Sequence, residues 1–337
     1  MKLNRQELLK ALDIVKIGLA KKELIEQSIC FVFMQGKVFT YNDEISVAHP
    51  ISTLDVTGAV KANAFYKLLN KITTDEVDLV VQGNELQVHA GRTKAGFVLQ
   101  EEIKLPIRAV GNISEWKKAP DKLRDALQFT MFSCATDMSR PVLTCIYVHE
   151  SGMVYSCDNY RVTSYNMEEQ LQIKSFLLPA HSAKEIVKYD ITKIAEGEGW
   201  VHFGTEEGTV ISCRVFEDKY PNVSKVLNMK EGDVLELPVE LKNVVNRAIV
   251  FTKKENILEE VVEVFITNDL VKVRAEGNGE WFEEEIPVEY SLEKSIKLKI
   301  NVHMLKDILQ RENTCSIKNS LVKFTGVNWE HVFCCFS

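Results

Sequence analysis

The sequence predicts an α+β fold made of three similar domains. The 337 residues repeat a pattern with a period of about 110 residues. Each repeat contains two segments whose apolar residues recur at helical spacing, and each helix is followed by several short strand-like runs. Runs of strands between isolated helices are typical of α+β domains with antiparallel sheets.

Each repeat opens with a predicted helix. In the first repeat, Leu8, Leu12, Val15 and Leu19 recur at helical spacing. The three opening segments are Arg5 to Lys21, Asp121 to Cys134, and Pro238 to Phe251.

Short strands and a second helix follow. The strands are rich in β-branched and aromatic residues and are bounded by Gly, Asn or Asp. The first strands include 30–33, 145–148 and 261–266; the second helices are 62–71, 182–188 and 302–309; and the closing strands include 77–81, 86–90, 201–203, 209–215, 315–317 and 321–325. Gly, Pro, Asn and charged residues gather near 106–120 and 226–237, which we interpret as linkers. The predicted domains are therefore 1–117, 118–230 and 231–337.

The overall charge argues against a generally basic surface. Asp and Glu outnumber Lys and Arg by 48 to 41, which gives a net charge of −7. Many of the basic residues nevertheless fall on predicted helices, whereas acidic pairs concentrate in strands and loops. If the helices share one surface, that surface is basic; the alternative is that these lysines only solvate helix faces. No aromatic residues alternate with the basic ones, so base stacking is not indicated.

The sequence offers no constellation typical of catalysis. The seven histidines show no metal-binding spacing, and no phosphate-binding loop or nucleophile motif is present. Glu283, Glu284 and Glu285 could bind a metal, but a solvated strand or loop is favoured. We therefore expect no enzyme activity, no cofactor and no metal.

The eight cysteines contain no C-x-x-C pair and mostly lie in apolar strand-like runs, which is typical of buried, reduced thiols. Adjacent Cys334 and Cys335 could be redox-active, but a final strand with alternating faces is favoured. The beginning of the chain lacks the apolar core of a signal peptide, and no apolar run approaches the ~20 residues that span a bilayer. We expect a cytoplasmic protein.

Ordered motifs extend over nearly the whole chain. They are Leu105-Pro106 with Asn112 and Trp116; Gln128 to Met131 followed by Ser139 to Thr144; Tyr155 to Val162; Asp218 to Asn222 with Lys225 to Leu227; and Leu241-Lys242 with Arg247-Ala248. In this order they resemble the first interdomain connection, the R-P-x-L-x-G turn, the T-D-G-H-R-L segment, the G-x-[FY]-P signature and the third-domain helix of the bacterial sliding clamp, the beta subunit of DNA polymerase III.

Several departures from the family pattern suggest a divergent member, such as one encoded by a phage or a mobile element. The P-x-L-P-I-L element after the first helix is replaced by Glu23 to Gln27. Cys157 and Asn159-Tyr160 replace the commoner Thr and Gly-His, and no proline lies near the end of the chain.

The resemblance implies three repeated clamp domains with helices lining a central hole and antiparallel sheets outside. Two chains would form a head-to-tail homodimer ring that encircles duplex DNA without sequence specificity and acts as a polymerase processivity factor. The implied DNA-binding residues are Lys21, Lys22, Lys71, Arg140, Lys188, Lys242 and Arg247. The implied dimer interface joins the segment Ala95–Gln100, with Phe97, to Val250 and Phe251.

The resemblance also implies a pocket for short linear motifs of DNA polymerase, clamp loader and repair proteins. Its residues would be Leu143, Cys157, Asn159, Tyr160, Arg161, Val162, Pro221, Val226, Leu321, Cys334, Cys335 and Phe336. The alternative for Leu143, Val162 and Val226 is that they are simply core residues. A second hypothesis for the whole chain is a clamp-like protein that does not close into a ring and acts as a decoy or scaffold for replication proteins.

Overall fold

The computed structural model describes residues 1–51, 53–229 and 232–336. Contacts between residues divide the chain into two compact units. The first unit comprises Met1–Gln128, Tyr147–Gly152 and Glu169–Asp218, and the second comprises Phe129–Ile146, Met153–Glu168 and Lys219–Ser337. The middle third of the chain contributes to both units, and the division into three domains stays a prediction.

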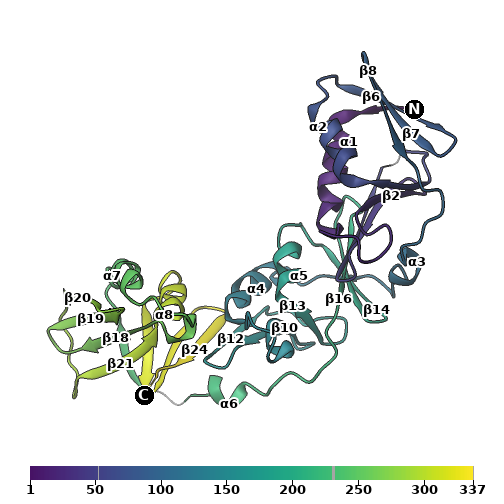
Figure 1. The fold of residues 1–337 in the computed structure, drawn as a ribbon. Helices are drawn as coiled ribbons and strands as arrows, with labels where there is room; N and C mark the ends of the chain where they lie inside the picture. Colours follow the sequence, from purple (N-terminus) through teal and green to yellow (C-terminus); the bar gives the residue numbers. More distant parts are fainter. Residues whose placement is uncertain (52, 230–231, 337) are drawn as a thin grey trace. The chain divides into compact units, whose positions relative to one another are not determined.

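The first unit contains two antiparallel sheets (Figure 1). One has four strands in the order β1-β6-β7-β8: β1 Lys2–Asn4, β6 Glu76–Gln82, β7 Glu85–Ala90 and β8 Thr93–Val98. The other has eight strands in the order β5-β2-β3-β4-β16-β15-β14-β9: β5 Gly58–Lys61, β2 Cys30–Met34, β3 Lys37–Tyr41, β4 Ile45–Pro50, β16 Val210–Arg214, β15 Trp200–Gly204, β14 Lys193–Gly197 and β9 Lys117–Lys118. Strand β13, Phe176–Pro179, is bridged to Phe216 through Leu177.

Helices of the first unit pack against these sheets. They are α1 Arg5–Val15 with the 3-10 turn η1 Lys16–Gly18, α2 Ala62–Lys71, α3 Ile107–Val110, α5 Ala180–Ile186 and most of α4 Leu123–Thr130. Helices α1 and α2 lie side by side (Figure 1). The Phe65 ring of α2 lies 6.5 Å from Phe31 and 6.2 Å from Phe33, measured between ring centroids, and all three rings are fully buried. This aromatic contact anchors α2 to strand β2.

The second unit repeats the plan. Its longer sheet runs in the order β10-β11-β12-β24-β23-β22-β17: β10 Cys145–Val148, β11 Met153–Cys157, β12 Arg161–Asn166, β24 Trp329–Cys334, β23 Leu321–Thr325, β22 Thr314–Lys318 and β17 Asp233–Glu236. Its four-stranded sheet has the order β20-β19-β18-β21: β20 Glu280–Pro287, β19 Leu270–Gly277, β18 Val261–Ile266 and β21 Ile296–Asn301. The helices are α6 Ser224–Leu227, α7 Leu241–Ala248 and α8 Val302–Leu309, and the 3-10 turns are η2 Met131–Ser133, η3 Pro141–Thr144, η4 Ile249–Phe251 and η5 Ile257–Glu259.

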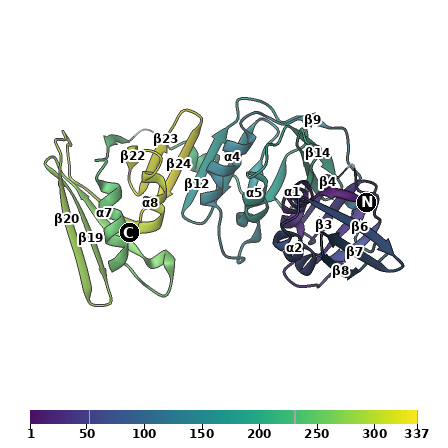
Figure 2. The ribbon, with the colours of Figure 1, turned by 90° about the horizontal axis from the view of Figure 1, so that it is seen from above.

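One apolar core holds the C-terminal part of this unit together. Figure 2 shows α7 and α8 between the strands of the four-stranded sheet and strands β22–β24. Val245 of α7, Ile308 of α8, Val264 of β18 and Phe324 of β23 belong to the same buried cluster. The helical spacing of the apolar residues therefore serves to fill the space between two sheets.

The predicted fold class is confirmed, and the second helices 62–71 and 302–309 match α2 and α8. The opening helices are shorter than predicted: α1 ends at Val15 and α7 at Ala248, each continued by one 3-10 turn. Gly18 ends η1 where a Cβ atom would lie 2.4 Å from the Thr40 hydroxyl oxygen. Consequently, Lys21 and Lys22 lie in a loop and not on a helix, and Lys188 lies just beyond α5.

The two segments interpreted as linkers are partly structured. Residues 106–120 contain α3 and β9, and residues 226–237 contain β17, which pairs with β22 from Leu235↔Cys315 to Asp233↔Ile317. Edge strands of this kind form because their backbones pair with strands far along the chain. The nearby turn-forming residues favoured a linker, so the sequence analysis did not predict these strands.

Six cysteines are buried, as predicted, while Cys334 is exposed and Cys335 is half-buried at the end of β24. Among the described residues, no group of three or more His, Cys, Asp or Glu side chains could hold a metal ion. No helix in the described part of the chain is long and apolar enough to cross a membrane.

Two buried histidines predict a loss of stability in mild acid. Burial lowers the pKa of His202 to about 4 and that of His331 well below its ordinary value of 6.5. Each Nδ1 is hydrogen-bonded to a hydroxyl, of Ser212 at 2.7 Å and of Thr163 at 2.8 Å, and neither Nε2 has a partner among the described residues. A proton is therefore taken up more readily by the unfolded chain than by the folded one.

We expect the free energy of unfolding to be constant above pH 6.5 and to fall as the pH drops from 6.5 towards 4. At pH 5.5 the loss should be about 1.4 kcal/mol for each histidine. Urea unfolding at pH 7.5 and 5.5 measures the loss, and His202→Gln should reduce it. Equal stability of the parent chain at both pH values would contradict the prediction.

Candidate functional site

The residues predicted to form a peptide pocket all belong to the second unit. They come from η3, from the end of β11, the turn after it and the start of β12, from α6 with the loop before it, from the start of β23, and from the end of β24 with the residues that follow. Leu143, Cys157 and Val162 are 2%, 3% and 6% exposed. The half-buried members are Tyr160, Arg161, Pro221, Val226, Leu321, Cys335 and Phe336, and the exposed ones are Asn159 and Cys334.

Backbone hydrogen bonds bring the end of the chain to this site. The Cys334 amide donates to the Tyr160 carbonyl at 2.8 Å, and the Cys335 amide donates to the Ser320 carbonyl at 2.7 Å. The Tyr160 and Phe336 rings lie 5.6 Å apart between centroids. These contacts fix a surface formed by Tyr160, Cys334 and Phe336, although these residues are far apart in the sequence.

The largely buried side chain of Arg161 connects several elements of the site. Its Nε donates to Asp158 at 3.1 Å and its Nη1 to Asp307 of α8 at 3.1 Å, and its guanidinium carbon lies 5.5 Å from the centroid of the Phe132 ring. The Arg161 side chain is 12% exposed. Its contacts therefore connect β12 to α8, which the sequence motif alone did not indicate.

A second group of contacts holds α6 against the strands. The Tyr220 hydroxyl donates to Cys157 Sγ at 3.3 Å, and Lys323 Nζ of β23 donates to the Leu227 carbonyl at 2.9 Å. Burial raises the pKa of the Cys157 thiol, so the group stays neutral at ordinary pH. Val226 of α6 stays half-buried.

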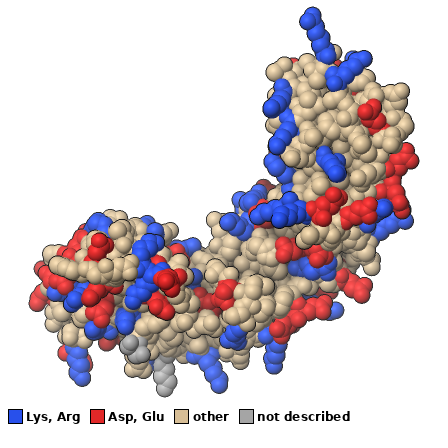
Figure 3. Space-filling model, viewed as in Figure 1, with Lys and Arg blue, Asp and Glu red and all other residues tan. Residues whose placement is uncertain are grey.

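Basic residues gather on the helices of the first unit. Figure 3 shows Lys and Arg side chains along the side of this unit where Figure 1 draws α1 and α2. The Tyr189 hydroxyl donates to the Ile14 carbonyl at 2.7 Å, which places the end of α5 beside α1, and the hollow between them is lined by Arg5, Lys10 and Lys188. Lys188 pairs with Glu185 at 2.6 Å, and Lys21, Lys22 and Lys71 are exposed.

The predicted DNA-binding residues of the second unit differ from one another in exposure and in their hydrogen-bond partners. Arg140 is exposed and donates to Asn159 at 3.3 Å, and Lys242 of α7 is half-buried. Arg247 donates to both carboxylate oxygens of Glu284, at 2.9 and 2.5 Å, and this pairing raises its pKa. Because Glu284 neutralises its charge, Arg247 is a weaker candidate for a phosphate contact than Lys21, Lys22 and Lys71, which have no ion pair among the described residues.

Both four-stranded sheets end in a strand that has no partner on its outer side among the described residues, β8 in the first unit and β20 in the second. On the inner face of each edge an aromatic ring is half-buried: Phe97 lies 5.3 Å from Phe65, and Phe282 is stacked 5.5 Å from Phe251. The other face exposes Val98 in β8 and Trp281 in β20, at 69% and 67%.

The two edges also carry opposite charges. The turn before β8 and the strand itself expose Arg92 and Lys94, while β20 exposes Glu280, Glu283 and Glu285. Lys272 of β19 pairs with Glu283 at 3.4 Å and with Glu285 at 3.0 Å, which offsets part of the negative charge of the β20 edge. The sequence analysis named Phe97, Val250 and Phe251 for this region but missed Trp281 and the charge difference. The grouping of two aromatic and four acidic residues along 280–285 was the available signal.

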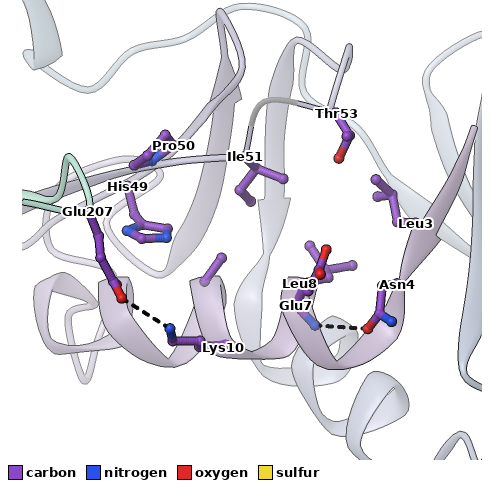
Figure 4. Close-up of a pocket in the computed structure, with 11 residues that line it drawn as sticks. Leu3, Asn4, Glu7, Leu8, Lys10, His49, Pro50, Ile51, Thr53 and Glu207 are labelled. Atoms are coloured by element: carbon purple, nitrogen blue, oxygen red, sulfur yellow. Dashed lines mark hydrogen bonds and ion pairs between the residues drawn. The ribbon is translucent and has the colours of Figure 1, made fainter.

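A small cavity in the first unit brings together titratable side chains of the kinds that enzymes use. It has a volume of about 340 Å³ and is lined by His49, Glu7, Lys10 and Glu207 among others (Figure 4). Glu207 is paired with Lys10 at 3.3 Å, and His49 Nδ1 is hydrogen-bonded to Thr209 at 2.8 Å. Burial lowers the pKa of His49. These groups are engaged with structural partners, and we assign no reaction to the cavity.

Comparison with known proteins points to one fold. No family model and no curated protein sequence matches the chain. Among solved structures, the DNA polymerase III subunit beta from Pseudomonas aeruginosa is similar with a TM-score of 0.87 and 18% identity, covering 100% of this chain and 99% of that one. The beta chain from Streptococcus pneumoniae gives 0.85 and 17% with the same coverage, and a putative beta subunit from Eubacterium rectale gives 0.84 and 16%, covering 99% and 98%. The chain has the fold of these sliding clamps.

Proposed function

We propose that this chain, which has the sliding-clamp fold, is a DNA sliding clamp. Two copies would join head to tail into a ring that encircles duplex DNA and tethers polymerase and other replication proteins. The observation that carries the proposal is the likeness of the whole chain to DNA polymerase III beta subunits, together with two half-sheets that end in edges of opposite charge.

Pairing β8 of one copy with β20 of another would complete both half-sheets. The combined order β1-β6-β7-β8-β20-β19-β18-β21 has eight strands, as many as the longer sheet of the first unit. Such pairing removes two exposed strand edges and brings Phe97 and Phe282 into one apolar layer. Joining β8 to β8, or β20 to β20, would bring like charges together, so the charges favour a head-to-tail contact, which generates rings when the rotation closes.

Basic residues on and beside the helices support a non-specific contact with the DNA backbone. Lys21, Lys22, Lys71, Arg140, Lys188 and Lys242 would attract phosphates without reading bases, and acidic surfaces elsewhere would repel DNA. A ring held on DNA by topology needs only weak attraction, which is compatible with the net charge of −7.

The decisive experiment compares circular and linear DNA. Subunits are diluted until they separate and are then concentrated in the presence of a nicked circular DNA. The protein bound to DNA is isolated by gel filtration at about 200 mM salt, because simple electrostatic binding is weak at that concentration. We expect the protein to stay on the circle and to be lost after a restriction enzyme linearises it. The native mass should be twice the 38.4 kDa of one chain.

Equal retention on circular and linear DNA would contradict a topological link. A single-chain mass in a protein that still captures replication proteins would favour the decoy or scaffold hypothesis instead.

The peptide pocket can be tested with two substitutions that differ in burial. Val226 is half-buried on α6, so Val226→Asp should leave the fold intact and weaken partner binding by about 30-fold, the loss expected for a well-packed contact. Leu143 is 2% exposed, so Leu143→Lys should instead destabilise the fold by about 3 kcal/mol or more, because it buries a charge.

The measurement is fluorescence anisotropy with a labelled peptide that carries a polymerase clamp-binding motif, with thermal unfolding of each variant alongside. Griselimycin, the ligand of one compared Pseudomonas aeruginosa clamp, serves as a second probe. Unchanged affinity in Val226→Asp would show that the pocket is misplaced.

A further inference from the structure

A cavity in the first unit combines an apolar floor with a rim of lysines. It has a volume of about 680 Å³ and lies between η1, strand β2 and the beginning of α2. Four lysines contribute to its lining, Lys16, Lys21, Lys61 and Lys67, and no acidic side chain does. The sequence did not indicate this cluster because the four residues come from separate segments of the chain.

Three of these lysines have charges that are not neutralised nearby. Lys21, Lys61 and Lys67 are exposed, and within the described residues none of them has a carboxylate within 4.0 Å. Lys16 is different, since it lies 3.9 Å from Asp13 and 4.2 Å above the Tyr66 ring. The rim therefore has three cations that are available to an anionic ligand.

The floor is apolar and firmly built. Leu19, Ala20 and Ile29, which are half-buried, supply its apolar surface, and the fully buried Phe31 supports them, with its ring centroid 6.5 Å from that of Phe65. Ala62, Asn63 and Ala64, the first turn of the ten-residue helix α2, form one wall. The Ala62 amide of that turn donates to the Ile29 carbonyl at 3.0 Å, and the N-cap residue Lys61 gives no side-chain hydrogen bond to the turn.

We propose that this cavity binds a nucleoside phosphate, with the base against the apolar floor and the phosphate between Lys21, Lys61 and Lys67. A cavity of this size is in the range of small-molecule sites, and a ligand with a flat apolar part and a concentrated negative charge matches its two kinds of lining. The ligand could be a free nucleotide or the end of an unpaired DNA strand, which share this chemistry. The proposal goes beyond the clamp function and does not require a ring.

The test measures direct binding to the purified full chain. Isothermal titration calorimetry is carried out with dATP, with a single-stranded oligonucleotide of ten thymidines and with inorganic phosphate. We expect dATP or the oligonucleotide to bind and phosphate alone to bind at least about 10-fold more weakly. A stronger signal from dATP identifies a free nucleotide as the ligand, and a stronger signal from the oligonucleotide identifies a strand end.

Substitutions distinguish a defined binding site from non-specific electrostatic attraction of the ligand to lysines. The double variant Lys61→Gln/Lys67→Gln should weaken binding by about 10-fold or more, and Ala64→Phe, which adds a ring to the wall while leaving every lysine, should weaken it similarly. Lys37→Gln changes the net charge at an exposed position of β3 that is not part of the lining and should leave binding unchanged.

The proposal is overturned by no binding of either nucleotide probe, by equal binding of phosphate and dATP, or by affinity that Ala64→Phe leaves unchanged. Binding of an acidic peptide with alternating Glu and Leu in place of both nucleotides would make the cavity a peptide site and also overturn it. Retention on circular DNA is measured separately, so failure here leaves the clamp proposal standing.

Discussion

Replacing Trp281 by aspartate is expected to convert the proposed ring into single chains. Trp281 is 67% exposed on β20 and would be covered by the β8 edge of the second copy. Large aromatic side chains at the centre of an interface commonly contribute 2 kcal/mol or more, which is about a 30-fold change in the dissociation constant. Aspartate at position 281 should weaken the dimer further than loss of the ring alone, because β20 already exposes Glu280, Glu283 and Glu285.

Analytical ultracentrifugation over a range of concentrations measures the effect. Val239→Asp is the matched control, since Val239 is 74% exposed and lies in the segment before α7, in neither β8 nor β20. Lys94→Glu should weaken the dimer as well, and its combination with a Glu283→Lys change should recover part of the loss. A Trp281→Asp protein that dimerises as tightly as the parent would exclude β20 from the interface.

Replacing Arg161 by methionine is expected to cause a large loss of stability, because the Arg161 side chain connects two elements at the predicted pocket. The change leaves Asp158, 13% exposed, without one partner and cuts the link to Asp307. Removing one partner of a buried ion pair typically costs about 3–5 kcal/mol, and the lower end applies here because Asp158 still accepts two backbone amides and Asp307 is 38% exposed.

Urea unfolding and calorimetry give the size of the loss. Arg140→Met is the control, because Arg140 is exposed and has only a 3.3 Å hydrogen bond to Asn159; it should change stability by less than about 0.5 kcal/mol. A double-mutant cycle with Asp307→Asn isolates the contribution of the link between β12 and α8. A change of less than 1 kcal/mol in Arg161→Met would show that the pair is not structural.

The parts of the fold that were predictable are those encoded by local spacing. Helices α2 and α8 were placed correctly because their apolar residues recur within one continuous segment. The end of α1 was missed because it depends on Thr40, which fills the space beside Gly18 and is 22 residues away. Strands β9 and β17 were missed because their only partners, β14 and β22, are far along the chain.

The candidate surfaces were likewise predictable in part from the sequence and in part only from the folded structure. The motif around Cys157 to Val162 marked the right region, but only the folded chain shows that Arg161 contacts Asp307, 146 residues later. Likewise, Arg247 and Lys71 were equivalent as basic residues in the sequence, whereas the structure gives Arg247 two hydrogen bonds to Glu284 and leaves Lys71 exposed.

The sequence by itself determined the α+β class, the repetition of helices and strands, and the resemblance to sliding clamps, because these depend on residue spacing and on short motifs. Only the tertiary structure decided which strands form sheet edges, which charges are neutralised and which lysines surround a cavity. Those properties arise from side chains that meet across long stretches of chain, and the spacing of residues along one segment does not contain that information.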